Sequence, residues 1–131
     1  MSQSKRLNPD EDQVLIDRLI QLFKRTDETH PIFADQIIKF FNKKIDDGKL
    51  NINGRMTDIK LRKCINHIRK HSLLPIISNS KGYYMSSDVQ VISNMITSLE
   101  SRCESIKQAA DGLRLILNKK VKSIDKLGIE W

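Results

Sequence analysis

The sequence predicts a mostly helical fold with one short β-hairpin and a long helix toward the carboxyl end. Three observations support this expectation. Apolar residues recur every three or four positions in three stretches before residue 72, two short runs of strand-forming residues flank a turn near residue 80, and no proline follows Ser87. We therefore expect three parts: an N-terminal helix and linker over residues 1–30, a compact domain over residues 31–86, and a long helix with a basic tail over residues 87–131.

The first helix is expected over residues 10–25. Asn8 suits the N-cap, and Pro9 suits the first helical position, where its missing N–H removes no hydrogen bond. The polar segment from Thr26 to His30 ends the helix. A broad apolar face predicts that one side packs into the core. This face consists of Leu15, Ile16, Leu19, Ile20, Leu22 and Phe23.

The second helix is expected to begin at Pro31 and to stop at Gly48. The apolar residues at helical spacing are Phe33, Ile37, Ile38, Phe41 and Ile45. An aromatic stripe on a helix serves packing far more often than ligand binding, so we interpret Phe33, Phe40 and Phe41 as core residues. The short spacing from Gly48 to Thr57 leaves no room for a further full helix.

A third helix is expected from Asp58 to about His71, with Thr57 as its N-cap. Its narrow apolar stripe consists of Leu61, Cys64, Ile65 and Ile68. The opposite side is polar and strongly cationic. It carries Lys60, Lys63, His67 and Lys70 at helical spacing, flanked by Arg62, Asn66 and Arg69. One face of this helix is therefore expected in the core and the other in solvent.

Two short segments of strand-forming residues follow, Leu74 to Ser78 and Tyr83 to Ser86. The residues between them favour a tight turn. They are Asn79, Ser80, Lys81 and Gly82. A helix followed directly by a hairpin is the arrangement of a winged helix-turn-helix. The sequence thus predicts this fold over residues 31–86, with the hairpin as its wing.

From Ser87 onward the sequence predicts one long helix, because Ser87 and Gln90 match a capping box. Apolar or small residues then alternate at spacings of three and four, which is the a/d pattern of a coiled coil. These seam residues are Val89, Ile92, Ile96, Leu99, Cys103, Ile106, Ala110, Leu113 and Leu117. We expect the seam to pair with a second copy, most simply in a homodimer, although a helix folded back on its own chain would also cover it. After Asn118 we expect a loose basic tail.

Positive charge is concentrated in the middle of the chain. The whole chain carries +7, and residues 55–81 hold seven Lys or Arg residues against Asp58 alone, so this segment contributes +6. A block of one sign on a folded segment indicates a polyanionic partner such as nucleic acid. The alternative is a charged helix face that is simply solvated.

An α-helix fits the major groove of duplex DNA, so the third helix is the expected contact surface. Arg62 and Asn66 suit base contacts, because Arg pairs bidentately with guanine and Asn with adenine. The lysines suit phosphates, and Lys81 at the hairpin tip suits an adjacent phosphate or the minor groove, unless it is a solvated turn residue. The full expected DNA-binding set is Arg55, Lys60, Arg62, Lys63, Asn66, His67, Arg69, Lys70 and Lys81.

The stretch MTDIKLRKCINHIRKHSLLPIISNSKGYYMS at positions 56–86 resembles the small winged-helix proteins of bacteriophage and prophage genomes. The shared pattern is a Thr-capped helix with a central L-R and a terminal I-R, an L-P-I strand, and a wing that closes on G-Y-Y. The segment SLESRCESIKQAADGL at 98–113 is similar to their trailing helix. The resemblance implies DNA binding in phage gene control or genome replication, with the third helix as the part that reads bases.

Enzymatic and metal-dependent functions find little support in the sequence. Cys64, His67 and His71 have spacings that zinc uses, but no fourth ligand lies nearby. Paired carboxylates, a phosphate loop and a nucleophile triad are missing, so we expect neither an enzyme nor a cofactor, metal or small-molecule substrate. No apolar run is long enough for a bilayer and the amino terminus lacks a signal-peptide pattern. We therefore expect a cytoplasmic protein, in the host bacterial cytoplasm if a phage encodes it.

Two other binding partners are kept as alternatives to DNA. The basic surface would also fit an acidic host protein, in the manner of a phage interaction protein. RNA is the second alternative, but single-stranded recognition generally uses exposed aromatic side chains. Tyr83 and Tyr84 are the only aromatic residues close to the basic segment, and at least one of them is expected to be buried.

Overall fold

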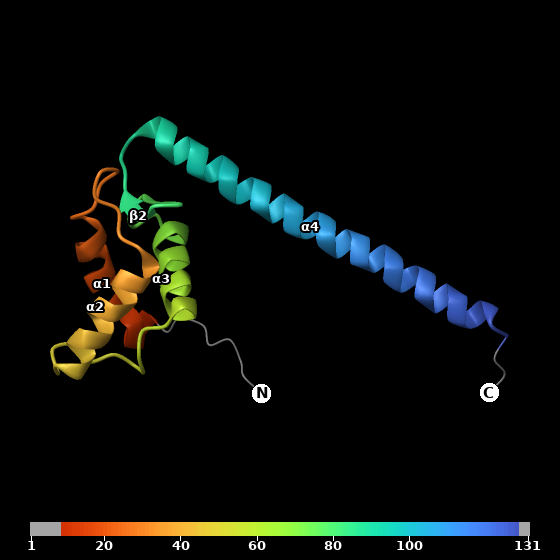
Figure 1. The fold of residues 1–131 in the computed structure, drawn as a ribbon, viewed down its shortest axis with the longest axis horizontal. Coiled ribbons are helices and arrows are strands. Elements are labelled where there is room, and N and C mark those ends of the chain that lie inside the picture. The colour runs from red at the N-terminus through yellow and green to blue at the C-terminus, as the bar shows by residue number, and fades with distance from the viewer. Residues whose placement is uncertain (1–8, 129–131) are drawn as a thin grey trace. The chain divides into compact units, whose positions relative to one another are not determined.

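A computed structural model describes residues 9–128 of the chain and contains four helices and one hairpin (Figure 1). The elements in order are α1 (Pro9–Phe23), α2 (Ala34–Asp46), α3 (Asp58–Lys70), β1 (Ile76–Asn79), β2 (Gly82–Met85) and α4 (Val89–Lys126). The chain divides into two compact units between Ile92 and Ser93, inside α4. The expected fold class, mostly helical with a hairpin and a long last helix, is confirmed at this level.

The helix α1 begins at Pro9 as expected, while Asn8, the expected N-cap, lies outside the described residues. Leu15, Leu19 and Phe23 are completely buried. Together with buried residues of α2, α3 and the hairpin they form one hydrophobic core. Thr26 ends this segment, and its hydroxyl donates to the Phe23 carbonyl oxygen and accepts the Met85 N–H, which ties the end of α1 to β2.

The helix α2 begins at Ala34, three residues later than the sequence predicted. The reason is a backbone bridge to β2: the Ile32 N–H donates to the Tyr83 carbonyl at 2.9 Å, and the Tyr83 N–H donates to the Ile32 carbonyl at 2.8 Å. Residues committed to this extended pairing cannot also be helical. Gly48 follows the helix with a φ of +72°, so the expected end is confirmed.

The prediction that Phe33 and Phe40 belong to the core is wrong, whereas Phe41 is buried. Phe33 is 53% exposed because it occupies the N-cap position of α2, where its backbone N–H donates to Gln36 Oε1. Phe40 is 48% exposed, since the buried face of α2 is centred on Ile37 and Phe41. The apolar stripe of this helix is therefore narrower than its aromatic content indicates.

The connection from α2 to α3 contains no helix, as the short spacing predicted. Asn42 of α2 fixes this loop through the backbone of Met56: its Nδ2 donates to the Met56 carbonyl at 3.0 Å, and its Oδ1 accepts the Met56 N–H at 2.8 Å. Met56 itself is buried. The N-cap of α3 is Thr57 as predicted, since its hydroxyl accepts the Lys60 N–H. The predicted apolar stripe of α3 is also confirmed, because Leu61, Cys64, Ile65 and Ile68 are all buried.

The strands β1 and β2 form the expected antiparallel hairpin, in the register Ile76 to Met85 through Asn79 to Gly82. Asn79 Oδ1 accepts the Lys81 N–H at 2.8 Å, which closes the turn. Tyr84 is buried, as expected of at least one of the two tyrosines. The hairpin follows α3 directly and contacts it through β1.

The N-terminal cap of α4 is Asp88 rather than the predicted Ser87. Asp88 Oδ1 accepts the N–H groups of Gln90 at 2.8 Å and Val91 at 3.3 Å. The helix runs to Lys126, so the expectation of a loose segment directly after Asn118 is wrong. Asp111 forms ion pairs with Lys107, one turn before it, and with Arg114, and the second pair spans Gly112 and supports the helix there.

Candidate nucleic-acid interface

Five of the nine expected contact residues lie on the outer face of α3. Arg62, Asn66 and Lys70 are exposed and lie one helical turn apart. Lys63 and His67 flank them and are half-buried. The inner face of the same helix is closed by residues such as Leu61 and Ile68, which are completely buried. The helix therefore presents a polar ridge on a rigid support.

Ile59 lies on this ridge and is a residue that the sequence analysis missed. Its side chain is 66% exposed, three positions before Arg62. A large apolar side chain gains nothing from exposure in the free protein. The available signal was its position on the helix, because Ile59 falls outside the apolar stripe of Leu61, Cys64 and Ile68.

Arg62 and Asp58 form an exposed ion pair at 2.8 Å between neighbouring turns of α3. Such surface pairs contribute about 0–1 kcal/mol. The guanidinium can therefore leave Asp58 for a stronger acceptor at little cost. Asp58 also carries the negative charge that suits the first turn of a helix.

Lys60 is directed toward the core instead of the outer ridge. Its side chain is 19% exposed, and Nζ lies 3.8 Å from Oδ1 of Asp12, a carboxylate that is 10% exposed. The same Nζ donates to the carbonyl oxygen of Asn53. Lys60 therefore joins α3 to α1 and to the preceding loop.

Two arginines of the expected set hold intramolecular positions. Arg69 Nε donates to the Ile76 carbonyl at 3.0 Å and an outer nitrogen donates to Ser78 Oγ at 3.2 Å, so this side chain fastens β1 to α3. Arg55 forms a two-point contact with Asp46, at 2.7 Å and 3.4 Å. The hydrogen bond from Arg55 and its charge lower the pKa of Asp46.

The rings of His67 and His71 contact each other, with centroids 4.4 Å apart and planes tilted by 52°. Partial burial lowers the pKa of His67, and the positive charges of His71 and Lys70 lower it further. His67 is therefore held toward its neutral form, in which one ring nitrogen accepts a hydrogen bond and the other donates one.

The structure thus divides the nine expected residues into two groups. The outer side of α3 carries five of them, Arg62, Lys63, Asn66, His67 and Lys70. Lys81 lies exposed in the turn of the hairpin. Arg55, Lys60 and Arg69 instead connect elements of the fold. The spacing of these residues in the sequence could not separate the two groups, because the acceptor groups of Arg55, Lys60 and Arg69 belong to other elements. These acceptors lie in α1, α2, β1 and the loop before α3.

A metal site at Cys64, His67 and His71 finds no support in the geometry. Cys64 is completely buried, and burial raises the pKa of its thiol to about 12. The thiolate that zinc requires is therefore strongly disfavoured. Among the side chains that the structure describes, no group of three or more His, Cys, Asp or Glu residues could hold a metal ion.

Of the helices in residues 9–128, none combines the length and apolar character that a membrane span requires. Comparison of the chain with known protein families, characterised proteins and solved structures finds no match.

Proposed function

We propose that residues 31–86 form a winged helix-turn-helix that binds double-stranded DNA, with α3 in the major groove and the β1–β2 hairpin against neighbouring phosphates. The observation that carries this proposal is the two-sided character of α3. One side is locked in the core, and the other offers Arg62, Asn66 and Lys70 to solvent on a supported helix. A helix of this kind matches the width of the major groove.

The exposed ridge supplies the chemistry that base recognition requires. Asn66 forms two hydrogen bonds to an adenine edge, and Arg62, once it leaves Asp58, forms two to a guanine edge. Ile59 makes an apolar contact with a thymine methyl group, which accounts for an exposed isoleucine at this place. His67 in its neutral form adds one acceptor beside this row.

We assign the phosphate contacts to Lys63, Lys70 and Lys81, because they lie on the outer side of α3 and in the turn of the hairpin. Lys60 and Arg69 are engaged inside the protein and contribute only to the surrounding potential. Arg55 forms an exposed ion pair with Asp46 and lies outside α3, so we do not assign it a phosphate. The number of phosphates that the protein contacts is therefore smaller than the charge of +6 on residues 55–81 indicates. With about three phosphates neutralised, log K should fall against log salt with a slope of about −3.

The biological setting that we propose is control of phage genes or assistance in phage genome replication. It rests on the resemblance of residues 56–86 to winged-helix proteins of phage and prophage genomes. The fold of this segment, a capped helix followed by a hairpin that closes on Gly82, Tyr83 and Tyr84, is compatible with that resemblance.

The test begins with selection of bound duplexes from a random pool, followed by affinity measurements by fluorescence anisotropy. On the selected site, Arg62→Ala and Asn66→Ala should each cost about 1–3 kcal/mol, and on a scrambled duplex they should cost much less. Lys63→Ala and Lys70→Ala should weaken binding to both duplexes alike and reduce the salt slope by about 1 each. Lys39→Ala, an exposed lysine of α2, is the matched control and should change neither.

An affinity that is indifferent to salt would reject the assignment. Retention of full affinity in an Arg62→Ala, Asn66→Ala double variant would show that another element reads the bases. Binding of an acidic protein or of single-stranded RNA, with no binding of duplex DNA under the same conditions, would favour the corresponding alternative.

A further inference from the structure

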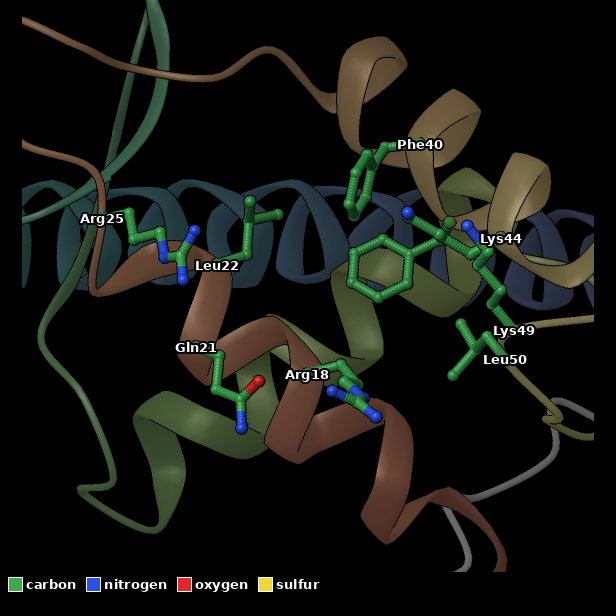
Figure 2. A pocket seen from close by; sticks show the side chains of 9 residues that line it. Arg18, Gln21, Leu22, Arg25, Phe40, Lys44, Lys49 and Leu50 are labelled. Carbon is green, nitrogen blue, oxygen red and sulfur yellow. The ribbon is translucent and has the colours of Figure 1, made fainter. Parts of the chain in front are cut away.

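A pocket of about 360 Å³ lies between α1 and α2, away from the residues assigned to DNA (Figure 2). Side chains of α1 and α2 face one another across it, and the loop after α2 closes one end. The lining residues are Arg18, Gln21, Leu22, Arg25, Phe40, Phe41, Lys44, Lys49 and Leu50. Its volume falls in the range of small-molecule sites, which begins at about 300 Å³.

The charge around this pocket is of one sign. Four of the lining residues are cations and none is acidic: Arg18, Arg25, Lys44 and Lys49. Among the described side chains, none of the four forms an ion pair. Other cations nearby do find carboxylates, as Lys43 does with Asp47 and Arg55 with Asp46. The pocket therefore gathers four positive charges that form no ion pair with a carboxylate of the described side chains.

The floor of the pocket is apolar and aromatic. Phe41 and Leu50 are buried there, while Phe40 stays 48% exposed and packs edge-on against Phe41 with ring centroids 5.6 Å apart. Lys44 Nζ lies 5.3 Å from the centroid of the Phe40 ring. The half-exposed phenyl ring of Phe40 and the ammonium group of Lys44 therefore place an apolar surface and a positive charge side by side.

We propose that this pocket binds a small organic anion, an aromatic phosphate or carboxylate, with its ring against Phe40 and Leu22 and its anionic group against the cations that line the pocket. The two arginines suit this group because a guanidinium binds phosphate or carboxylate through two parallel hydrogen bonds. The location also explains why the core prediction for Phe40 failed: the ring lines a pocket and is covered only in part.

Duplex DNA is a poorer occupant of this pocket than a small anion. DNA backbones bind to surfaces that track many phosphates, whereas this cavity holds about one ring system and its substituent. None of the lining residues comes from α3 or the hairpin. The proposal therefore stands apart from the proposed DNA contact and can fail without it.

The experiment uses the full chain and 1-naphthyl phosphate as the probe, with isothermal titration calorimetry and amide chemical shifts at fixed ionic strength. We expect one-to-one binding with shifts centred on the lining residues. Inorganic phosphate, which lacks the ring, and 1-naphthol, which lacks the charge, should each bind about tenfold more weakly or worse. A parallel titration with 2-naphthoate distinguishes a phosphate site from a carboxylate site.

Two variants and one control test the location of the ligand. Lys44→Glu and Phe40→Ala should each weaken binding of 1-naphthyl phosphate by about tenfold or more. Lys39→Glu, the same charge change on an exposed lysine of α2 outside the pocket, should have little effect. Arg25→Glu, just beyond the end of α1, replaces Lys44→Glu if circular dichroism shows that the latter does not fold.

Three results would overturn the proposal. Equal affinity for 1-naphthyl phosphate and inorganic phosphate would mean that the pocket attracts anions through its positive charge alone and does not bind the aromatic ring. Unchanged binding in both Lys44→Glu and Phe40→Ala would place the ligand elsewhere. Displacement of the probe by duplex DNA, together with weaker DNA binding of Lys44→Glu, would assign these cations to the DNA surface instead.

Discussion

Lysines and arginines of residues 55–81 differ in the partners that their side chains find. Lys60 reaches Asp12 on α1, and Arg69 reaches the backbone of β1, so both stabilise the assembly of the core. Lys70 and Lys81 remain exposed. Side chains of the same charge thus divide into those that hold the fold and those available to a partner. Burial and the position of acceptor oxygen atoms decide between these roles.

His67 should make the stability of the protein depend on pH. Its pKa is lowered in the folded chain by partial burial and by His71 and Lys70, so the unfolded chain takes up a proton at higher pH than the folded one. By linkage, stability is fully present above the unfolded pKa of about 6.5 and falls as the pH decreases below it. Urea denaturation from pH 7.5 to 5.5 should therefore show a decreasing free energy of unfolding, and His67→Gln should reduce that decrease. An identical pH dependence in the variant would contradict this account.

Among the elements, those set by local pattern were predictable and those set by remote contacts were not. The apolar stripe and Thr57 cap of α3 follow from neighbouring residues, and both were predicted. The start of α2 was misplaced because Ile32 pairs with Tyr83, a residue far along the chain. The pocket was not foreseen, since its cations come from α1, α2 and the segments that follow each of them, and only folding brings them together.

Asn42 should be critical for the connection between α2 and α3. Its side chain satisfies both the N–H and the carbonyl of Met56, whose own side chain is buried in the core. Asn42→Ala removes both partners and leaves backbone groups unpaired, so it should cost about 1–3 kcal/mol in the free energy of unfolding. Asn51→Ala, an exposed asparagine of the same connection, is the control and should change stability by less than about 0.5 kcal/mol. Equal losses in the two variants, measured by urea denaturation, would refute the role of Asn42.

Gly82 should be required for the close approach of the hairpin to the segment before α2. Its φ is +117°, and a Cβ at this place would lie 2.5 Å from the Ile32 carbonyl oxygen. Gly82→Ala should therefore break the Ile32–Tyr83 bridge and cost about 2–4 kcal/mol. Gly48→Ala is the control, because Gly48 shares a positive φ but has open space around it, and its cost should be about 1 kcal/mol.

Tyrosine fluorescence is a suitable measurement for this pair of variants, because the only two tyrosines of the chain, Tyr83 and Tyr84, both lie in β2. In a Trp131→Phe background, where tryptophan emission does not mask the tyrosines, unfolding curves in urea report on the surroundings of the hairpin. Losses of the same size in Gly82→Ala and Gly48→Ala would mean that backbone strain alone matters and that the contact with Ile32 does not.

At the scale of the whole molecule, the two compact units differ in how they satisfy their apolar residues. The first unit closes a core around residues such as Leu19, Phe23 and Ile37, which are completely buried. The second unit is the larger part of α4, where Ile106 and Leu113 are 71% and 67% exposed. Tertiary packing of an apolar face supplies most of the stability of helices in proteins. We therefore expect another apolar surface to cover the seam of α4.

We predict that the protein forms a homodimer through this seam. Pairing two copies of α4 along Val89, Ile96 and Leu99 and the later a/d positions removes exposed apolar surface from water, which is the main driving force of association. Light scattering at micromolar concentration should give about twice the chain mass of 15.2 kDa. A Leu99→Asp, Ile106→Asp variant should be monomeric yet folded. Ser101→Asp with Gln108→Asp, two exposed positions of α4 off the seam, should remain dimeric.

The dimer also bears on the proposed DNA contact, because one α3 with about three phosphate contacts has a modest affinity. Joining two such domains raises the effective concentration of the second at a neighbouring half-site, and two-fold symmetry then favours an inverted-repeat sequence. The Leu99→Asp, Ile106→Asp variant should consequently bind a selected duplex more weakly than the unaltered chain, although every residue of α3 is retained.

A mass that stays near 15.2 kDa in the unaltered protein would end the dimer hypothesis and would mean that the seam is covered within one chain. In that case single half-sites should dominate the selected sequences.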